Sequence, residues 1–100
     1  MPTWSDYQCE DYLEAPEAQQ GYWDEPGQVW IIEPLDKVEE RPGEAFLQVG
    51  RPGVDDIGFG YRAHQQGFWA LKRMPCVEYQ YLAPTMGEFL KGWLAGTISL

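Results

Sequence analysis

The sequence predicts an α+β fold in which a β-meander is followed by one C-terminal helix. Short apolar runs alternate with Gly- and Pro-containing turns through the middle of the chain, as in "FLQVGRPGVDDIGFGYRAHQQGFWAL" at residues 46–71. A helix with a start signal and a stop signal follows at residues 84–96. The chain has 100 residues, which is the size of one domain, so we expect a single domain over residues 1–100.

Five short segments have the composition of strands. They are rich in β-branched and aromatic residues, lie between turn signals, and cover residues 28–33, 45–50, 57–62, 68–73 and 77–82. In "IGFGYR", Ile57, Phe59 and Tyr61 share one face of the strand, and Gly58 and Gly60 share the other. Glycines on one strand face allow a side chain or a backbone to approach closely, and Trp69 or Trp93 are candidates to cover them.

The C-terminal helix has the clearest local signals. Thr85 is placed as the N-cap, and Glu88 follows three residues later, as in a capping box. An apolar stripe and a C-terminal glycine follow, formed by Phe89, Leu90, Trp93, Leu94 and Gly96.

The first half of the chain has weaker signals. Residues 1–20 form a short acidic segment in which Tyr12 and Leu13 allow one or two helical turns, ended by Pro16. Residues 19–27, "QQGYWDEPG", are predicted as loop. "PLDKVEE" at residues 34–40 is predicted as a helix of one or two turns, closed by "RPGE".

The charge is unevenly distributed along the chain. Residues 1–44 contain twelve acidic residues against Lys37 and Arg41, whereas the rest is close to neutral and the whole chain carries −9. Such an acidic half favours basic partners and opposes binding to nucleic-acid phosphates or anionic lipid. Equally, the carboxylates can serve only to keep an aromatic-rich chain in solution.

The N-terminus has neither a basic nor an apolar targeting region, and no apolar run is long enough for a transmembrane helix. We therefore expect a cytoplasmic protein with no membrane association. Cys9 and Cys76 are then expected to be free thiols rather than a disulfide.

The residue patterns favour no cofactor, metal or catalytic site. "GFG" lacks the third glycine and the following helix of a dinucleotide-binding loop. Cys9, Cys76 and His64 have no paired spacing typical of metal ligands, and "RPGVDD" is a turn rather than a calcium loop. The one histidine, His64, lies in a turn, so neither a nucleophile–base pair nor an enzyme is expected.

The order of the motifs resembles the SUKH superfamily. The resemblance covers residues 20–96 and rests on five segments in order: "GYWDEPG", "IIEPLDKV", "FLQVGRPG", "IGFGYR" with "FWALKRMP", and "APTMGEFL". Two features depart from the family pattern. Only twenty residues precede Gly21, where relatives have longer helices, and Gly60-Tyr61 replaces a common aspartate.

The resemblance implies a twisted, mainly antiparallel sheet of four to five strands with the C-terminal helix packed on one face. It also implies a non-enzymatic role, because bacterial SUKH proteins are largely immunity proteins that neutralise a cognate toxin, often a nuclease. On this basis we expect a protein partner with a basic surface. The candidate contact residues lie in two loops: Tyr22, Trp23, Asp24, Glu25, Asp55 and Asp56.

Three alternatives remain open from the sequence. An acidic protein can mimic nucleic acid and inhibit a DNA- or RNA-binding protein, or it can act as a regulatory scaffold. A small hydrolase would need a cleft in which His64 or Cys76 converge with other groups. An exposed aromatic patch would also allow weak dimerisation of an otherwise monomeric chain.

Overall fold

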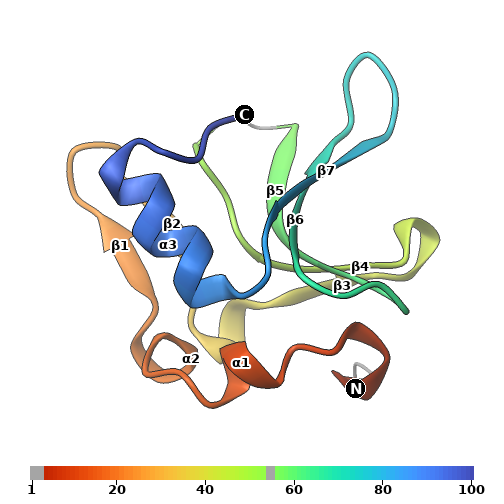
Figure 1. The fold of residues 1–100 in the computed structure, drawn as a ribbon, viewed down its shortest axis with the longest axis horizontal. Helices are drawn as coiled ribbons and strands as arrows, with labels where there is room; N and C mark the ends of the chain where they lie inside the picture. Colours follow the sequence, from red (N-terminus) through yellow and green to blue (C-terminus); the bar gives the residue numbers. More distant parts are fainter. Residues whose placement is uncertain (1–3, 54–55) are drawn as a thin grey trace.

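The computed structural model describes residues 4–53 and 56–100, and Figure 1 shows their arrangement. The elements in chain order are η1 (Trp4–Tyr7), α1 (Glu10–Leu13), α2 (Glu17–Gln20), β1 (Tyr22–Asp24), β2 (Val29–Ile32), η2 (Leu35–Lys37), β3 (Glu39–Arg41), η3 (Pro42–Glu44), β4 (Phe46–Gly50), β5 (Ile57–Arg62), β6 (Phe68–Lys72), β7 (Glu78–Ala83) and α3 (Met86–Ala95). Here η denotes a 3-10 helix. The predicted α+β class is confirmed.

The main sheet is an antiparallel meander of five strands in the order β3-β4-β5-β6-β7. Its register pairs Leu47 with Tyr61, Gly60 with Trp69 and Leu71 with Tyr79. Side chains alternate along a strand, so the register defines two faces. We call the face bearing Leu47, Phe59, Tyr61 and Phe68 the helix face. The opposite face bears all four arginines of the chain, as described below, and we call it the arginine face.

Helix α3 packs on the helix face, as expected. The ring centroid of Phe89 lies 4.7 Å from those of Phe59 and Phe68, and Trp93 contacts Phe59 at 5.2 Å. Phe59, Phe68 and Phe89 are fully buried, so this aromatic cluster is the centre of the core. The predicted stripe is wrong at Leu94, whose side chain is 53% exposed, because the buried side of the helix runs through Met86, Phe89 and Leu90.

Both ends of α3 are capped as predicted. The Thr85 hydroxyl accepts a hydrogen bond from the Glu88 N–H at 3.1 Å. Gly96 ends the helix in the left-handed region, with φ of 79°, which a residue with a side chain adopts only at a cost.

The glycines of β5 allow close approach, as their spacing predicts. A methyl group on Gly58 would lie 2.4 Å from the Gln48 Oε1, and one on Gly60 would lie 1.9 Å from the Leu47 carbonyl oxygen. Gln48 therefore fills the space above Gly58. Of the two tryptophans considered for this role, Trp69 lies opposite Gly60, whereas Trp93 packs on the other face of the sheet.

The N-terminal segment forms short helical turns, as expected. Tyr7 and Tyr12 are buried, and the Tyr12 hydroxyl donates to the Glu33 carbonyl oxygen at 2.6 Å. Pro16 is the N-cap of α2. Leu13 is 39% exposed, so it does not contribute to the core in the way that Tyr12 does.

The predicted loop at residues 19–27 is wrong in its middle. Residues 22–24 form β1, which pairs with β2 in an antiparallel hairpin. The T-shaped contact between Trp23 and Trp30, with centroids 5.2 Å apart, joins the two strands. This cross-strand aromatic pair stabilises the hairpin. Pro26 and Gly27 lie in its turn, and because both are loop signals the whole segment was predicted as loop.

The predicted helix at residues 34–40 is also wrong in its second half. It ends after η2, and residues 39–41 form β3 against β4. An isolated helix of two turns is only marginally stable, whereas β3 gains ladder hydrogen bonds to β4. Past the end of β3, the backbone at β2 lies beside β4. The Glu33 N–H donates to the Val49 carbonyl, and the Arg51 N–H donates to the Trp30 carbonyl.

Candidate functional site

The β1–β2 hairpin presents an exposed indole in a fixed position. The Trp23 side chain is 41% exposed and rests edge-on against Trp30. Its Nε1–H donates to the Glu25 Oε2 at 2.6 Å. The ring is thereby held from one side by an aromatic face and from another by a carboxylate, which reduces the rotamer freedom that it would lose on binding.

The other hairpin candidates have different roles. Tyr22 is half-buried and packs against the core. The Asp24 carboxylate accepts a hydrogen bond from the Gly27 N–H at 3.1 Å and thus stabilises the turn. Glu25 is exposed. The structure therefore leaves Trp23 and Glu25 as the hairpin side chains most available to a partner.

The second candidate loop lies partly outside the described residues. Asp55 is not among them, whereas Asp56 is exposed and its carbonyl accepts from the Arg73 N–H at 3.0 Å. The beginning of this loop lies beside the hairpin, because a methyl group on Gly53 would lie 3.8 Å from the Val29 side chain. Val29 is in turn paired with Asp24.

Acidic side chains are frequent in the segments before the hairpin and within it. Residues 1–36 contain nine acidic residues and no lysine or arginine. Figure 1 shows α1, α2 and β1 together on the left and lower side of the molecule, away from the β6–β7 connection. Several of these carboxylates are exposed: Asp6, Glu10, Glu14, Glu25 and Asp36. With Trp23, the four that lie on α1, the hairpin and η2 define what we call the acidic surface. Asp6 is separate from it, because its carbonyl oxygen accepts from the His64 N–H of the β5–β6 connection.

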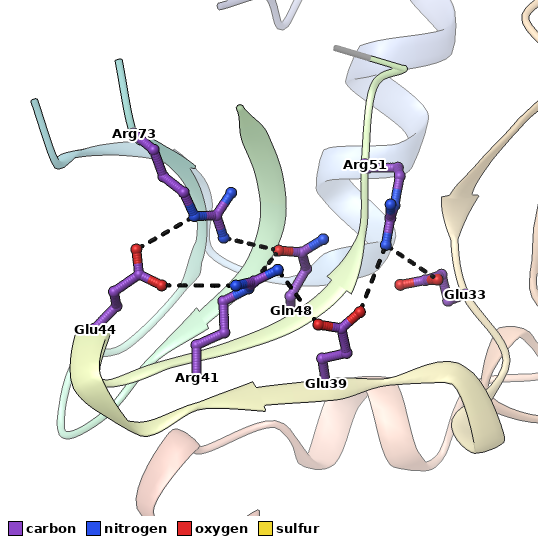
Figure 2. A network of polar contacts seen from close by, with 7 residues as sticks. All are labelled: Glu33, Glu39, Arg41, Glu44, Gln48, Arg51 and Arg73. Atoms are coloured by element: carbon purple, nitrogen blue, oxygen red, sulfur yellow. Dashed lines mark hydrogen bonds and ion pairs between the residues drawn. The ribbon is translucent and has the colours of Figure 1, made fainter. Parts of the chain in front are cut away.

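The arginine face carries the four arginines of the chain. Figure 2 shows three of them, Arg41, Arg51 and Arg73, in a network with Glu33, Glu39, Glu44 and Gln48. The Arg73 Nη2–H and the Arg41 Nε–H both donate to the buried Gln48 Oε1, at 3.1 and 3.2 Å. Arg73 also donates to Glu44 at 3.3 Å.

The fourth arginine is stacked rather than paired with a carboxylate. The Arg62 guanidinium lies 3.9 Å from the Tyr79 ring centroid and 4.7 Å from that of Trp69. Phe46 and Leu71 lie on this face and are fully buried, and in the sheet register Phe46 is paired with both Arg41 and Arg62. The apolar stems of long cationic side chains can cover such residues. Sequence patterns did not indicate this network, because Glu33 next to β2 and Arg73 next to β6 meet the residues of β3 and β4 only in the folded chain.

Glu33 is the most unusual member of the network. The Glu33 side chain is 7% exposed, and its Oε1 is buried with no hydrogen-bond partner among the described residues. Its Oε2 lies 3.7 Å from the Arg51 Nη2, which lies 3.9 Å from Glu39 as well. Burial raises the pKa of the Glu33 carboxyl, and the neighbouring Arg51 only partly opposes this.

Asp11 is a second polar residue that the sequence analysis missed. Its Oδ2 accepts hydrogen bonds from the Tyr61 hydroxyl at 3.0 Å and from the Met86 N–H at 2.7 Å. Met86 is the first residue of α3, so this carboxylate satisfies one of the unpaired donors at the helix N-terminus. Burial, followed by the nearby Asp11 charge, raises the pKa of Tyr61.

The groups considered for catalysis do not converge. His64 lies in the β5–β6 connection and Cys76 in the β6–β7 connection, at opposite ends of β6. Cys76 is exposed, whereas Cys9 is buried, and burial raises the pKa of the Cys9 thiol to about 11. Within residues 4–53 and 56–100, no cluster of three or more His, Cys, Asp or Glu side chains is placed to hold a metal ion.

Among the helices that the structure describes, none has the length and apolar character needed to span a bilayer. Comparison with protein-family models, with curated proteins and with solved structures found no match.

Proposed function

We propose that this chain is a non-enzymatic binding protein that uses its acidic surface to bind and neutralise a basic protein domain. The fixed, exposed indole of Trp23 beside Glu25 is the observation that carries the proposal. Tryptophan is enriched among the residues that dominate binding energy at protein interfaces. A tryptophan this exposed contributes little to the core, so a binding role accounts for its position.

The charge distribution supports a basic partner. Nine carboxylates and no cation lie within residues 1–36, and two of them, Asp11 and Glu33, are used inside the fold. The remainder generate a negative field around Trp23, which accelerates encounter with a positively charged surface. The active clefts of nucleases are such surfaces, since they receive phosphate groups.

The resemblance of the chain to SUKH immunity proteins favours the same conclusion. It suggests a toxin domain, such as a nuclease, as the partner that is neutralised. In this proposal Trp23 inserts at the centre of the contact and the surrounding carboxylates face lysine or arginine side chains of the toxin. The protein then inhibits by covering the cleft rather than by chemistry.

The proposal is tested by capture and inhibition with one variant and one control. Tagged wild-type protein is used to capture partners from source-cell lysate and, separately, the product of the adjacent gene. Trp23→Ala is expected to weaken binding at least about tenfold, as for a central aromatic anchor. Leu94→Ala removes an apolar side chain of comparable exposure from α3 and is expected to leave affinity unchanged.

The salt dependence and the nature of the partner separate the alternatives. A basic enzyme that is released steeply by salt and inhibited stoichiometrically supports the proposal. A captured DNA- or RNA-binding protein would support nucleic-acid mimicry instead. A partner that binds Trp23→Ala as well as wild type, with no dependence on salt, would contradict the acidic surface as the binding site.

A further inference from the structure

The β1–β2 hairpin carries Trp23 and forms a two-stranded sheet of its own, which meets the five-stranded sheet at β4. Two backbone hydrogen bonds join the two sheets at this place. The Glu33 N–H donates to the Val49 carbonyl at 2.6 Å, and the Arg51 N–H donates to the Trp30 carbonyl at 3.1 Å. We call this contact, made by Trp30, Glu33, Val49 and Arg51, the hairpin junction.

The two residues that donate these hydrogen bonds also face each other through their side chains. The Arg51 Nη2 lies 3.7 Å from the Glu33 Oε2 and 3.9 Å from the Glu39 Oε1, and Figure 2 shows the guanidinium between the two carboxylates. The Glu33 side chain is 7% exposed, whereas that of Arg51 is 43% exposed. The hairpin junction therefore contains an ion pair whose acidic member is buried and whose basic member reaches solvent.

The Glu33 carboxylate is poorly satisfied in this position. Its Oε1 is buried without a hydrogen-bond partner in the described part of the chain. The separation of 3.7 Å between its Oε2 and Arg51 is longer than a charge-assisted hydrogen bond, which is about 2.8 Å. Burying an ionised carboxylate is costly unless its oxygens are well paired. The ionised form of Glu33 therefore opposes the burial that the hairpin junction imposes, and the neutral form does so much less.

The other charged and titratable groups that face Glu33 do not cancel this cost. Burial raises the pKa of the Glu33 carboxyl, Arg51 opposes the rise, Glu39 of β3 adds to it, and Lys37 of η2 weakly opposes it. From α1, the Tyr12 hydroxyl donates to the Glu33 carbonyl oxygen at 2.6 Å. Burial raises the pKa of Tyr12 as well, so this hydroxyl stays neutral where carboxyl groups titrate. Of these groups, Glu33 is the one that titrates inside the junction.

We propose that the hairpin junction is a pH-sensitive contact, which stays closed while Glu33 carries a proton and opens locally more often once Glu33 is ionised. In the open form Glu33 is hydrated and binds its proton less tightly, so a rise in pH favours opening. Local opening releases one unit of a domain while the rest stays folded. Because the released unit is the hairpin, the charge of Glu33 controls how firmly Trp23 and Glu25 are attached to the main sheet.

The first test is amide hydrogen exchange followed by NMR, with rates corrected for intrinsic exchange. Between pH 4.5 and about pH 7.5, protection of the Glu33 and Arg51 amides is expected to fall by up to about tenfold per pH unit, and to level off once Glu33 is fully ionised. Amides of the β5–β6 ladder are expected to be better protected at every pH. Glu33→Gln should remove the pH dependence at the junction, because an amide does not titrate.

The second test shifts the titration of Glu33 without changing Glu33 itself. Arg51→Gln keeps the backbone N–H of the junction but removes the cation, so it is expected to raise the pKa of Glu33 and extend the fall in protection to higher pH. Glu39→Gln removes a neighbouring negative charge and should have the opposite effect. The side chains of Arg51 and Glu39 are 43% and 51% exposed, so both variants are expected to fold. Side-chain carboxyl ¹³C shifts report the pKa of Glu33 in each variant.

Several results would overturn the proposal. Junction amides that are protected as strongly as the β5–β6 ladder would mean that the junction opens only when the whole domain unfolds. Protection that is constant with pH in the wild type, or that falls as steeply in Glu33→Gln, would exclude Glu33 as the controlling group. A pKa of Glu33 that ignores both Arg51→Gln and Glu39→Gln would do the same. These measurements need no partner, so their failure is distinguishable from failure of the proposed function.

Discussion

Glu33 is a charged residue that lies in the interior of the protein. It directly follows the apolar strand "VWII" and precedes Pro34, so it is buried together with that strand. Its side chain is almost fully buried, yet one oxygen has no hydrogen-bond partner in the described part of the chain. Burying a partly satisfied carboxylate is costly, and the free energy of unfolding should register that cost through its pH dependence.

We predict that Glu33→Gln flattens the pH dependence of stability. The folded-state pKa of Glu33 is raised, so the folded state holds the proton more tightly than the unfolded state. The wild type should therefore lose free energy of unfolding as pH rises from the ordinary carboxyl value of 4.5 through the raised folded value. Each unit of pKa shift corresponds to about 1.4 kcal/mol, and an amide does not titrate. Urea unfolding between pH 4 and pH 8 measures the difference.

The matched control for this experiment is Glu14→Gln, which changes an exposed glutamate at the end of α1. It should leave the slope of stability against pH as it is in the wild type. Equal slopes for Glu33→Gln and wild type would show that the buried carboxyl does not titrate differently in the folded state.

At the scale of elements, the short N-terminal helices act through specific polar contacts rather than through their own stability. Helix α1 has only four residues, too few to persist alone. Asp11 links it to β5 through Tyr61 and to α3 through the Met86 N–H. Tyr7 adds a further link, because its hydroxyl donates to Glu40 of β3 at 2.8 Å. The N-terminal segment thus joins the sheet to the first turn of α3.

We predict that Asp11→Ala destabilises the protein by about 2 kcal/mol, since it removes two hydrogen bonds to a carboxylate and leaves a helix donor unpaired. Asp11→Asn keeps an acceptor oxygen and should cost less. Glu14→Ala, three residues along the same turn and exposed, should change the free energy of unfolding by under about 0.5 kcal/mol. Urea denaturation compares the three variants. A loss for Asp11→Ala no larger than that for Glu14→Ala would contradict the link between α1 and α3.

At the scale of the whole molecule, opposite charges are separated in space. Three of the four arginines lie in the partly buried network on the arginine face, and Arg62 is stacked on Tyr79 and Trp69 there. The exposed carboxylates of residues 10–36 lie mostly on the acidic surface. Salt screens exposed charges strongly and half-buried pairs weakly. Repulsion on the acidic surface should therefore respond to salt more than the attraction within the network.

We predict that the folded protein becomes more stable as NaCl is raised from about 0.01 M to about 0.5 M at pH 7, because repulsion among the exposed carboxylates is screened. The thermal midpoint, measured by circular dichroism, should rise by several degrees. A variant with Glu10→Gln and Glu14→Gln should start from a higher midpoint and gain less. A midpoint that falls with salt would mean that the arginine network dominates the electrostatic contribution to stability.

Much of the fold was predictable because its signals are local. The capped helix at residues 84–96, the meander through β4, β5, β6 and β7, and the close approach at Gly58 and Gly60 all follow from side-chain periodicity and turn residues. The errors lie where a partner strand decides the conformation. Residues 22–24 and 39–41 are strands because β2 and β4 pair with them, and no pattern within three residues encodes a partner.

The candidate site divides in the same way. The sequence by itself determined the uneven distribution of charge along the chain. It also indicated Trp23 and Glu25 as candidate contact residues, because composition and aromatic content can be read without knowing which residues are in contact. Only the tertiary structure decided that Tyr22 and Asp24 are used by the fold, that Asp11 caps a helix 75 residues away, and that all four arginines share one face. The positions of these side chains depend on which segments of the chain are neighbours in the folded protein. Strand register and packing decide which segments are neighbours, and hydrogen bonds and buried charges act between neighbours in space rather than in sequence.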